Sequence, residues 1–132
     1  MQIVALYLIT ATVFLLLDAV MLKTVIKPLF EQHIGGWLLD EIRLRPAILF
    51  YMFYIAGVLW FVSIPALRAG LPINALIGGA LLGALAYGTY EFTNYATLRD
   101  WSAQMVALDL AWGTFLTGFS AWVGVMVVRA FN

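Results

Sequence analysis

The chain has 132 residues, of which 64% are hydrophobic and only 11% are charged, with seven basic and seven acidic side chains. A soluble domain averages about 45–50% apolar and about 25% charged residues, so this chain has too little polar surface to face water on all sides. Its net charge of zero argues against a nucleic-acid partner, and the absence of cysteine excludes a disulfide framework and a thiolate metal site. We therefore expect one domain, residues 1–132, whose main partner is the lipid bilayer.

Four stretches reach the roughly 20 mostly apolar residues that a helix needs to cross the bilayer core. Their apolar runs are continuous and lack the alternation of a membrane strand, which favours helices over a β-barrel. The first run has no basic residue before it and contains Asp18, so we interpret it as a retained helix, not a cleaved signal. The expected fold is all-α and polytopic, a four-transmembrane-helix bundle with spans at about residues 3–22, 46–67, 72–96 and 102–128.

The first connection, residues 23–45, is the only long one, and it mixes apolar with charged residues. We interpret part of it as an amphipathic helix that lies in the membrane interface and is broken at Gly35 and Gly36. The second and third connections are short, which predicts that helices two, three and four are antiparallel neighbours.

The basic residues are divided unequally between the two ends of the expected bundle. The first and third connections hold five of them, and the opposite side holds two, Arg68 and Arg129. Because cytoplasmic loops carry an excess of Lys and Arg, we expect these connections in the cytoplasm and both termini on the other side. The bias is modest and leaves a dual-topology dimer open. The five are Lys23, Lys27, Arg43, Arg45 and Arg99.

Three carboxylates, Asp18, Glu91 and Asp109, fall inside the expected spans, each towards the expected cytoplasmic end. At about 1.5 Å rise per residue they lie about 7–12 Å inward from the polar ends of their helices, and thus in one layer. In the fourth span, Asp109 belongs to a stripe of small and polar residues that predicts close helix packing and an inward position. That stripe continues through Gly113, Thr117, Ser120 and Gly124, and Gly79 and Gly83 form a GxxxG surface in the third span.

An ionised side chain at the centre of the bilayer costs about 2.5–3.5 kcal/mol on insertion scales. Three such groups must therefore accept hydrogen bonds, bind protons or hold a cation. We expect a tyrosine-lined acidic cavity near the cytoplasmic side, which binds or transports a proton, a small cation or a small molecule. The expected binding residues are Asp18, Tyr51, Tyr54, Tyr87, Glu91, Asn94, Asp109 and Trp112.

No cofactor and no metal site are expected in this cavity. A divalent cation held by the three acids and Asn94 is disfavoured, because crowded aromatic rings leave little room for six or more oxygen ligands. His33 is the only histidine and has no companion ligands. We interpret Trp37 and Trp101 as interfacial belt residues.

Several of these segments together resemble a family of bacterial membrane proteins, domain of unknown function 2177. The resemblance covers nearly the whole chain, and its most specific part is the stretch from Tyr87 to Trp101. It implies a four-span protein of the bacterial inner membrane, with periplasmic termini by the charge rule, and it implies no reaction. The segments are Leu17 and Asp18, Phe50–Tyr54, Pro65–Leu67, Tyr87–Trp101 and Asp109–Thr114.

The chain departs from the family pattern at two positions. Glu91 stands where the family usually has Asp, and Met21 stands where it usually has Trp. Glu91 keeps the acid but adds a methylene group, which argues against tight metal geometry at this position.

Two other functions stay open from the sequence. A membrane-embedded enzyme acting on a lipid or isoprenoid would use the carboxyls as general acid and base and would line an acyl slot with Trp60 and Trp112. No nucleophile–base pair or phosphate loop is present, so enzymatic activity is undecided and disfavoured. A structural subunit of a larger complex would use the small-residue surfaces for packing. A transporter of this length would need a homodimer, because 132 residues are too few for an inverted repeat.

Overall fold

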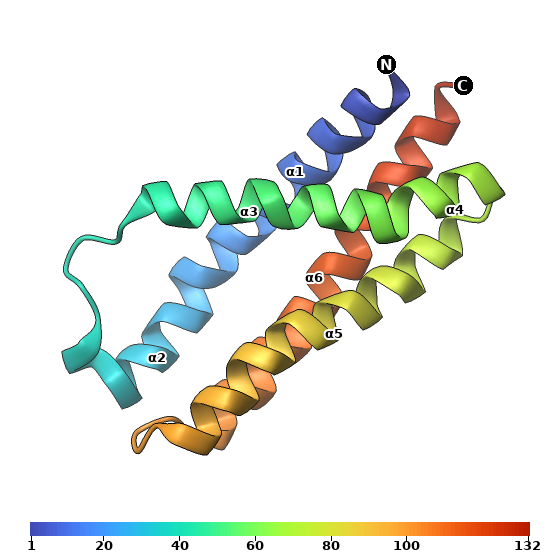
Figure 1. The fold of residues 1–132 in the computed structure, drawn as a ribbon. Helices are drawn as coiled ribbons and strands as arrows, with labels where there is room; N and C mark the ends of the chain where they lie inside the picture. Colours follow the sequence, from blue (N-terminus) through green and yellow to red (C-terminus); the bar gives the residue numbers. More distant parts are fainter.

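The computed structural model describes all of residues 1–132 and is entirely helical (Figure 1). Four continuous helical segments are long and apolar enough to cross a membrane, which confirms the predicted number of spans. The first is α1 (Gln2–Met21), the π-helical η1 (Leu22–Ile26), α2 (Lys27–Ile34) and the 3₁₀ turn η2 (Gly35–Trp37). The second is α3 (Leu44–Val58), the π-helical η3 (Leu59–Ser63) and α4 (Ile64–Ala69), followed by α5 (Pro72–Thr97) and α6 (Ala103–Ala130).

Each π-helical segment ends two residues before a proline: η1 precedes Pro28 and η3 precedes Pro65. Proline has no N–H to donate, and its ring clashes with the carbonyl four residues earlier in a regular α-helix. A wider turn at that carbonyl relieves the clash, and this is a common site for a π-bulge. Both long helices therefore continue past their prolines instead of stopping.

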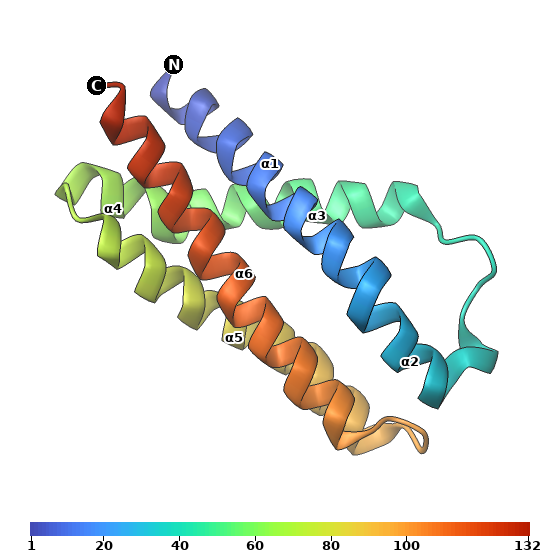
Figure 2. The ribbon, with the colours of Figure 1, turned by 180° about the vertical axis from the view of Figure 1, so that it is seen from behind.

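The α5–α6 hairpin is the most closely packed part of the molecule (Figure 2). A Cβ atom added to Gly79 would lie 2.8 Å from Gly118 Cα, and one added to Gly118 would lie 2.8 Å from Leu76 O. Glycine is required at both positions because the backbones touch there. The GxxxG surface expected from the sequence thus packs α5 directly onto α6.

Helix α1 packs on another side of α6, and the two run antiparallel. A Cβ atom at Gly124 would overlap Thr10 and lie 3.2 Å from Leu6 Cδ1. All five members of the small-residue stripe on α6 are buried, which agrees with the inward face expected from its spacing. The main apolar core forms between α1, α6 and the second segment from the end of α3 onward, and includes Phe14, Ile55 and Leu116.

The second segment crosses the others steeply and is not an antiparallel neighbour along its length, as was expected (Figures 1 and 2). Residues 44–50 are exposed on every face of α3, while η3 and α4 contact α5 and α6. The expectation was wrong because Gly79 and Gly83 pack α5 on α6, while the second segment meets α5 mainly through η3 and α4. A short connection brings only the adjoining ends of two helices together.

The first connection also differs from the expectation. The helix does not end near Leu22 but continues through η1 and α2 in the direction of α1 (Figure 2). It breaks at Gly35, as its glycines predict, and only residues 38–43 form an irregular link. The apolar side of α2 explains the extension: Leu29 and Ile34 are buried in a second cluster with Trp101, Met105 and Val106 near the α5–α6 turn.

Candidate functional site

Glu91, on α5, is a fully buried carboxyl group with a single hydrogen-bond partner. Its exposed fraction is 0%. The indole Nε1–H of Trp101 donates to Glu91 Oε1 over 2.9 Å, and Glu91 Oε2 has no partner. The Trp101 ring meets Phe30 and Tyr90 edge-on, with ring centroids 5.3 and 5.7 Å away. Trp101 is thus buried beside the acid, and its interpretation as an interfacial belt residue was wrong.

Asp109 is the carboxyl neighbour of Glu91. It is buried on α6. Because α5 and α6 form an antiparallel hairpin, Asp109 lies at the same height along the hairpin as Glu91. Neither acid forms an ion pair, and the one ion pair of the molecule joins Lys27 to Glu31 at the surface of α2. Two carboxyl groups therefore meet inside the hairpin without a balancing cation.

Asp18 belongs to a second contact, between α1 and α6. The indole Nε1–H of Trp112 donates to Asp18 Oδ1 over 3.1 Å, and the Tyr51 hydroxyl of α3 lies next to the same carboxyl. Asp18 is buried with only 4% of its surface exposed. The site therefore joins three of the four membrane-length segments around this carboxyl.

The other two predicted tyrosines, Tyr54 and Tyr87, pack against α6. Tyr54 shares a 2.9 Å hydrogen bond with Thr117 of α6, and its ring lies 6.5 Å from that of Tyr87. The Tyr87 ring rests directly on Gly113, where a Cβ atom would overlap it. Tyr87 is also within electrostatic range of Asp18, Tyr51, Tyr54 and Asp109, which makes it the central residue of the group.

Asn94 lies apart from this centre. It is one turn closer to the end of α5 than Glu91 and is partly exposed. Its backbone carbonyl accepts from the Leu98 amide at the helix end. Its assignment as a binding residue stays a prediction.

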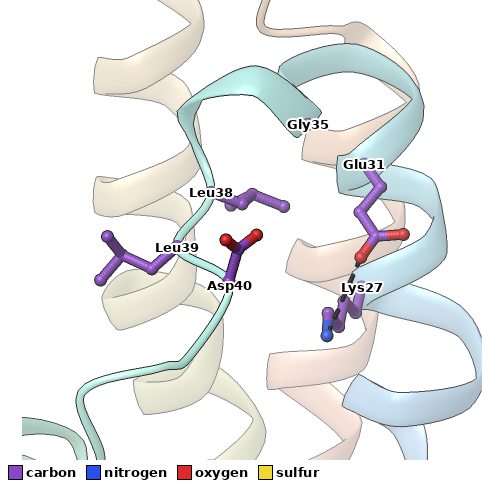
Figure 3. A pocket seen from close by; sticks show the side chains of 6 residues that line it. All are labelled: Lys27, Glu31, Gly35, Leu38, Leu39 and Asp40. Atoms are coloured by element: carbon purple, nitrogen blue, oxygen red, sulfur yellow. Dashed lines mark ion pairs between the residues drawn. The ribbon is translucent and has the colours of Figure 1, made fainter.

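Two surface hollows lie at opposite ends of the molecule, and none of the eight expected residues lines either one. The first lies beside α2, where Glu31 points toward Lys27 and Asp40 lies across from them (Figure 3). The three carboxyl groups of Asp18, Glu91 and Asp109, which we call the carboxyl layer, line neither of these two hollows. No three of the Asp, Glu and His side chains are close enough together to hold a metal ion.

Residues 3–126 match the sequence family described as a predicted membrane protein (DUF2177). The chain belongs to this family. The match covers nearly the whole molecule and includes every residue of the carboxyl layer. No curated protein sequence and no solved structure matches the chain.

Sequence reasoning missed two contributors to the site, Trp101 and Phe14. Trp101 lies in the turn between α5 and α6, and its indole reaches back to a carboxyl group ten residues earlier, a contact that helix periodicity does not predict. Phe14 lies one turn before Asp18, and its ring centroid is 5.7 Å from that of Tyr51 and 5.8 Å from that of Tyr54. Its apolar character gave no signal of a role at the site.

Proposed function

We propose that this DUF2177 protein binds and releases a proton at the Glu91–Asp109 pair and uses that step to transport a small molecule. The observation that carries the proposal is a fully buried Glu91 with one unpartnered oxygen, next to a second buried carboxyl and without a basic partner. Two like charges at close range in a low-dielectric interior cannot both ionise at low cost, so the pair is expected to share a proton.

A proton suits this site better than a metal cation. Calcium prefers six to eight oxygen ligands, and magnesium demands octahedral geometry. The carboxyl pair is enclosed by Trp101 and Tyr90, with no third acid close enough to help. A proton needs no such shell.

The Asp18 contact provides a third carboxyl group in addition to this pair. Tyr87 is close to both Asp18 and Asp109 and carries a hydroxyl group. We propose that Tyr51, Tyr54 and Tyr87 line the route of the small molecule from the cytoplasmic side, with Asp18 and Trp112 as its other wall. The carrier acts as a homodimer in this proposal, because a single copy lacks an inverted repeat.

The proposal places the protein in the bacterial inner membrane with α2 and the α5–α6 turn on the cytoplasmic side. A helix of 36 residues, Gln2–Trp37, is about 54 Å long, which exceeds the roughly 30 Å bilayer core. About 24 Å of it, nearly half, must therefore lie outside the core unless the helix tilts. The charged residues Lys27 and Glu31 favour α2 as the part that lies at the interface.

The first experiment measures proton binding directly, by infrared difference spectroscopy of the protein in lipid membranes during a pH titration. We expect a buried protonated-carboxyl C=O band that changes with pH. It should be lost or shifted in both Glu91→Gln and Asp109→Asn, and kept in Glu31→Gln, whose carboxylate is exposed. An unchanged band in both of the first two variants, with helix content intact, would remove the proton site.

The second experiment measures transport. Proteoliposomes loaded with a pH-sensitive dye are exposed to a panel of small-molecule cations, and proton movement is recorded on addition of each. Wild type and Glu31→Gln should show movement with at least one compound, and Glu91→Gln should show none. If the panel moves no protons in any variant although the infrared band is present, the carrier role fails and proton binding alone survives.

A further inference from the structure

A second charged feature lies at the end of the molecule that holds both termini (Figure 1). Arg68 is in the last turn of α4, and Arg129 is in the last turn of α6. Both are exposed and line one surface hollow together with the start of α1. The full lining consists of Gln2, Ile3, Ile64, Leu67, Arg68, Arg129 and Asn132.

These two arginines differ from the other basic residues in having no acid nearby. Lys27 pairs with Glu31 at 3.8 Å, and Arg99 is followed directly by Asp100. The nearest Asp or Glu in sequence to Arg68 is Glu91, 23 residues later. No ion pair involves Arg68 or Arg129, so neither guanidinium group is paired with an Asp or Glu side chain.

The hollow is amphipathic as well as basic. Ile3, Ile64 and Leu67 give it an apolar wall, and the two guanidinium groups come from the ends of membrane-length helices, at the depth of lipid headgroups. Guanidinium is planar and binds phosphate through paired hydrogen bonds. A ligand with a phosphate group and an attached acyl chain matches both parts of this surface.

We propose that the hollow between Arg68 and Arg129 binds the phosphate group of an anionic phospholipid, with an acyl chain along Ile3, Ile64 and Leu67. The site is separate from the carboxyl layer and does not depend on proton binding there. A single exposed arginine attracts headgroups without forming a defined site. Here two helices each contribute an arginine to the same hollow, so the pair forms a binding site.

Native mass spectrometry of the detergent-solubilised protein tests the proposal, with equal amounts of phosphatidylglycerol and phosphatidylcholine as probes. Wild type should retain phosphatidylglycerol preferentially. Because each basic side chain near the surface adds to the attraction for anionic lipid, the double variant Arg68→Gln/Arg129→Gln should lose that preference by roughly tenfold or more. Arg99→Gln, which removes a single exposed arginine at the other end, should behave like wild type.

Two further arms distinguish a bound phospholipid from free phosphate and from loss of folding. Arg68→Lys/Arg129→Lys keeps both charges and should keep most of the preference, which also guards against misfolding of the Gln variant. Excess inorganic phosphate should leave the bound lipid in place, since it cannot use the apolar wall. Equal lipid retention by wild type and the Gln variant overturns the site, and displacement of the lipid by free phosphate overturns the lipid as its ligand.

Discussion

Trp101 supplies the one hydrogen bond to the fully buried carboxyl group of Glu91. Replacing Trp101 with Phe keeps an aromatic ring against Phe30 and Tyr90 but removes the N–H donor. A buried acceptor left without its donor costs about 1–3 kcal/mol, so we expect the free energy of unfolding to fall by about that amount. Sodium dodecyl sulfate titration followed by far-ultraviolet circular dichroism measures this change.

Trp37→Phe is the matched control for that experiment. Trp37 is 55% exposed at the end of the first helical segment, and its indole makes no hydrogen bond with the protein, so its replacement should leave the unfolding free energy nearly unchanged. Equal effects of the two substitutions would show that ring size matters and the Glu91 hydrogen bond does not.

For two buried serines we predict the opposite effect on the free energy of unfolding. Ser63 and Ser120 are fully buried, and their hydroxyl groups have no partner in the protein. By contrast, exposed threonines such as Thr12 and Thr89 donate to the carbonyl four residues earlier. Removing an unsatisfied hydroxyl group removes a desolvation cost, so Ser63→Ala and Ser120→Ala should be neutral or should stabilise by up to about 1 kcal/mol. A loss of more than about 1 kcal/mol in the same titration would contradict this account.

At the residue scale, the sequence identified the acids but not all their partners. Charged residues inside long apolar runs are visible without a structure, so Asp18, Glu91 and Asp109 could be predicted to be buried. Trp101 was misassigned because a tryptophan near a helix end fits an interfacial belt as well as a buried contact. The fold decides between a belt residue and a buried contact, because α2 brings Phe30 against Trp101.

The α5–α6 hairpin is the element whose packing depends most on glycine. A Cβ atom added to Gly83 would lie 2.9 Å from Thr117 Oγ1 and would overlap the Gly113 carbonyl oxygen. Gly83→Ala should therefore force α5 and α6 apart and destabilise the protein by about 1–3 kcal/mol, as overpacking does elsewhere. Thermal unfolding in detergent, followed by circular dichroism, should show a lower midpoint.

Gly57→Ala is the control for the hairpin prediction. Gly57 lies within α3, and a Cβ atom there would meet nothing within 4 Å. Alanine has the higher helix propensity, by about 1 kcal/mol in soluble hosts. The midpoint for Gly57→Ala should stay the same or rise. A lower midpoint for Gly57→Ala than for Gly83→Ala would refute the packing argument.

At the element scale, the spans and the α5–α6 pairing were predictable, but the course of the first two segments was not. Hydropathy and helix length are local properties, and they located all four segments. The continuation of α1 into α2 depends on contacts between Leu29 and residues near the α5–α6 turn, which are about 75 residues away in sequence. The close packing of α5 on α6 through Gly79 and Gly83 is also a long-range contact, and the steep crossing of α3 depends on it.

At the scale of the whole molecule, both ends of the bundle carry basic side chains, but only one end also carries acidic ones. The terminal end carries Arg68 and Arg129 without an acid, and the opposite end carries the other five basic residues together with Glu31, Asp40, Glu41 and Asp100. The excess of basic residues at the second end is the observation from which we propose an orientation in the membrane. The orientation bears on the proposed function directly, because the compartment from which the carboxyl layer is reached depends on it.

Cysteine labelling tests this orientation in a clean background, since the chain has no cysteine of its own. Leu71, between α4 and α5, and Leu98, at the end of α5, are exposed leucines at opposite ends of the same helix. A membrane-impermeant maleimide applied to intact cells should label Leu71→Cys, and should label Leu98→Cys only after the membrane is permeabilised. The reverse pattern would place the carboxyl layer nearer the periplasm and would invert the direction of the proposed transport. Equal labelling of both in intact cells would mean that the five-to-two charge bias is too weak to fix one orientation, so that a homodimer would contain two oppositely inserted copies and supply the inverted symmetry that one chain lacks.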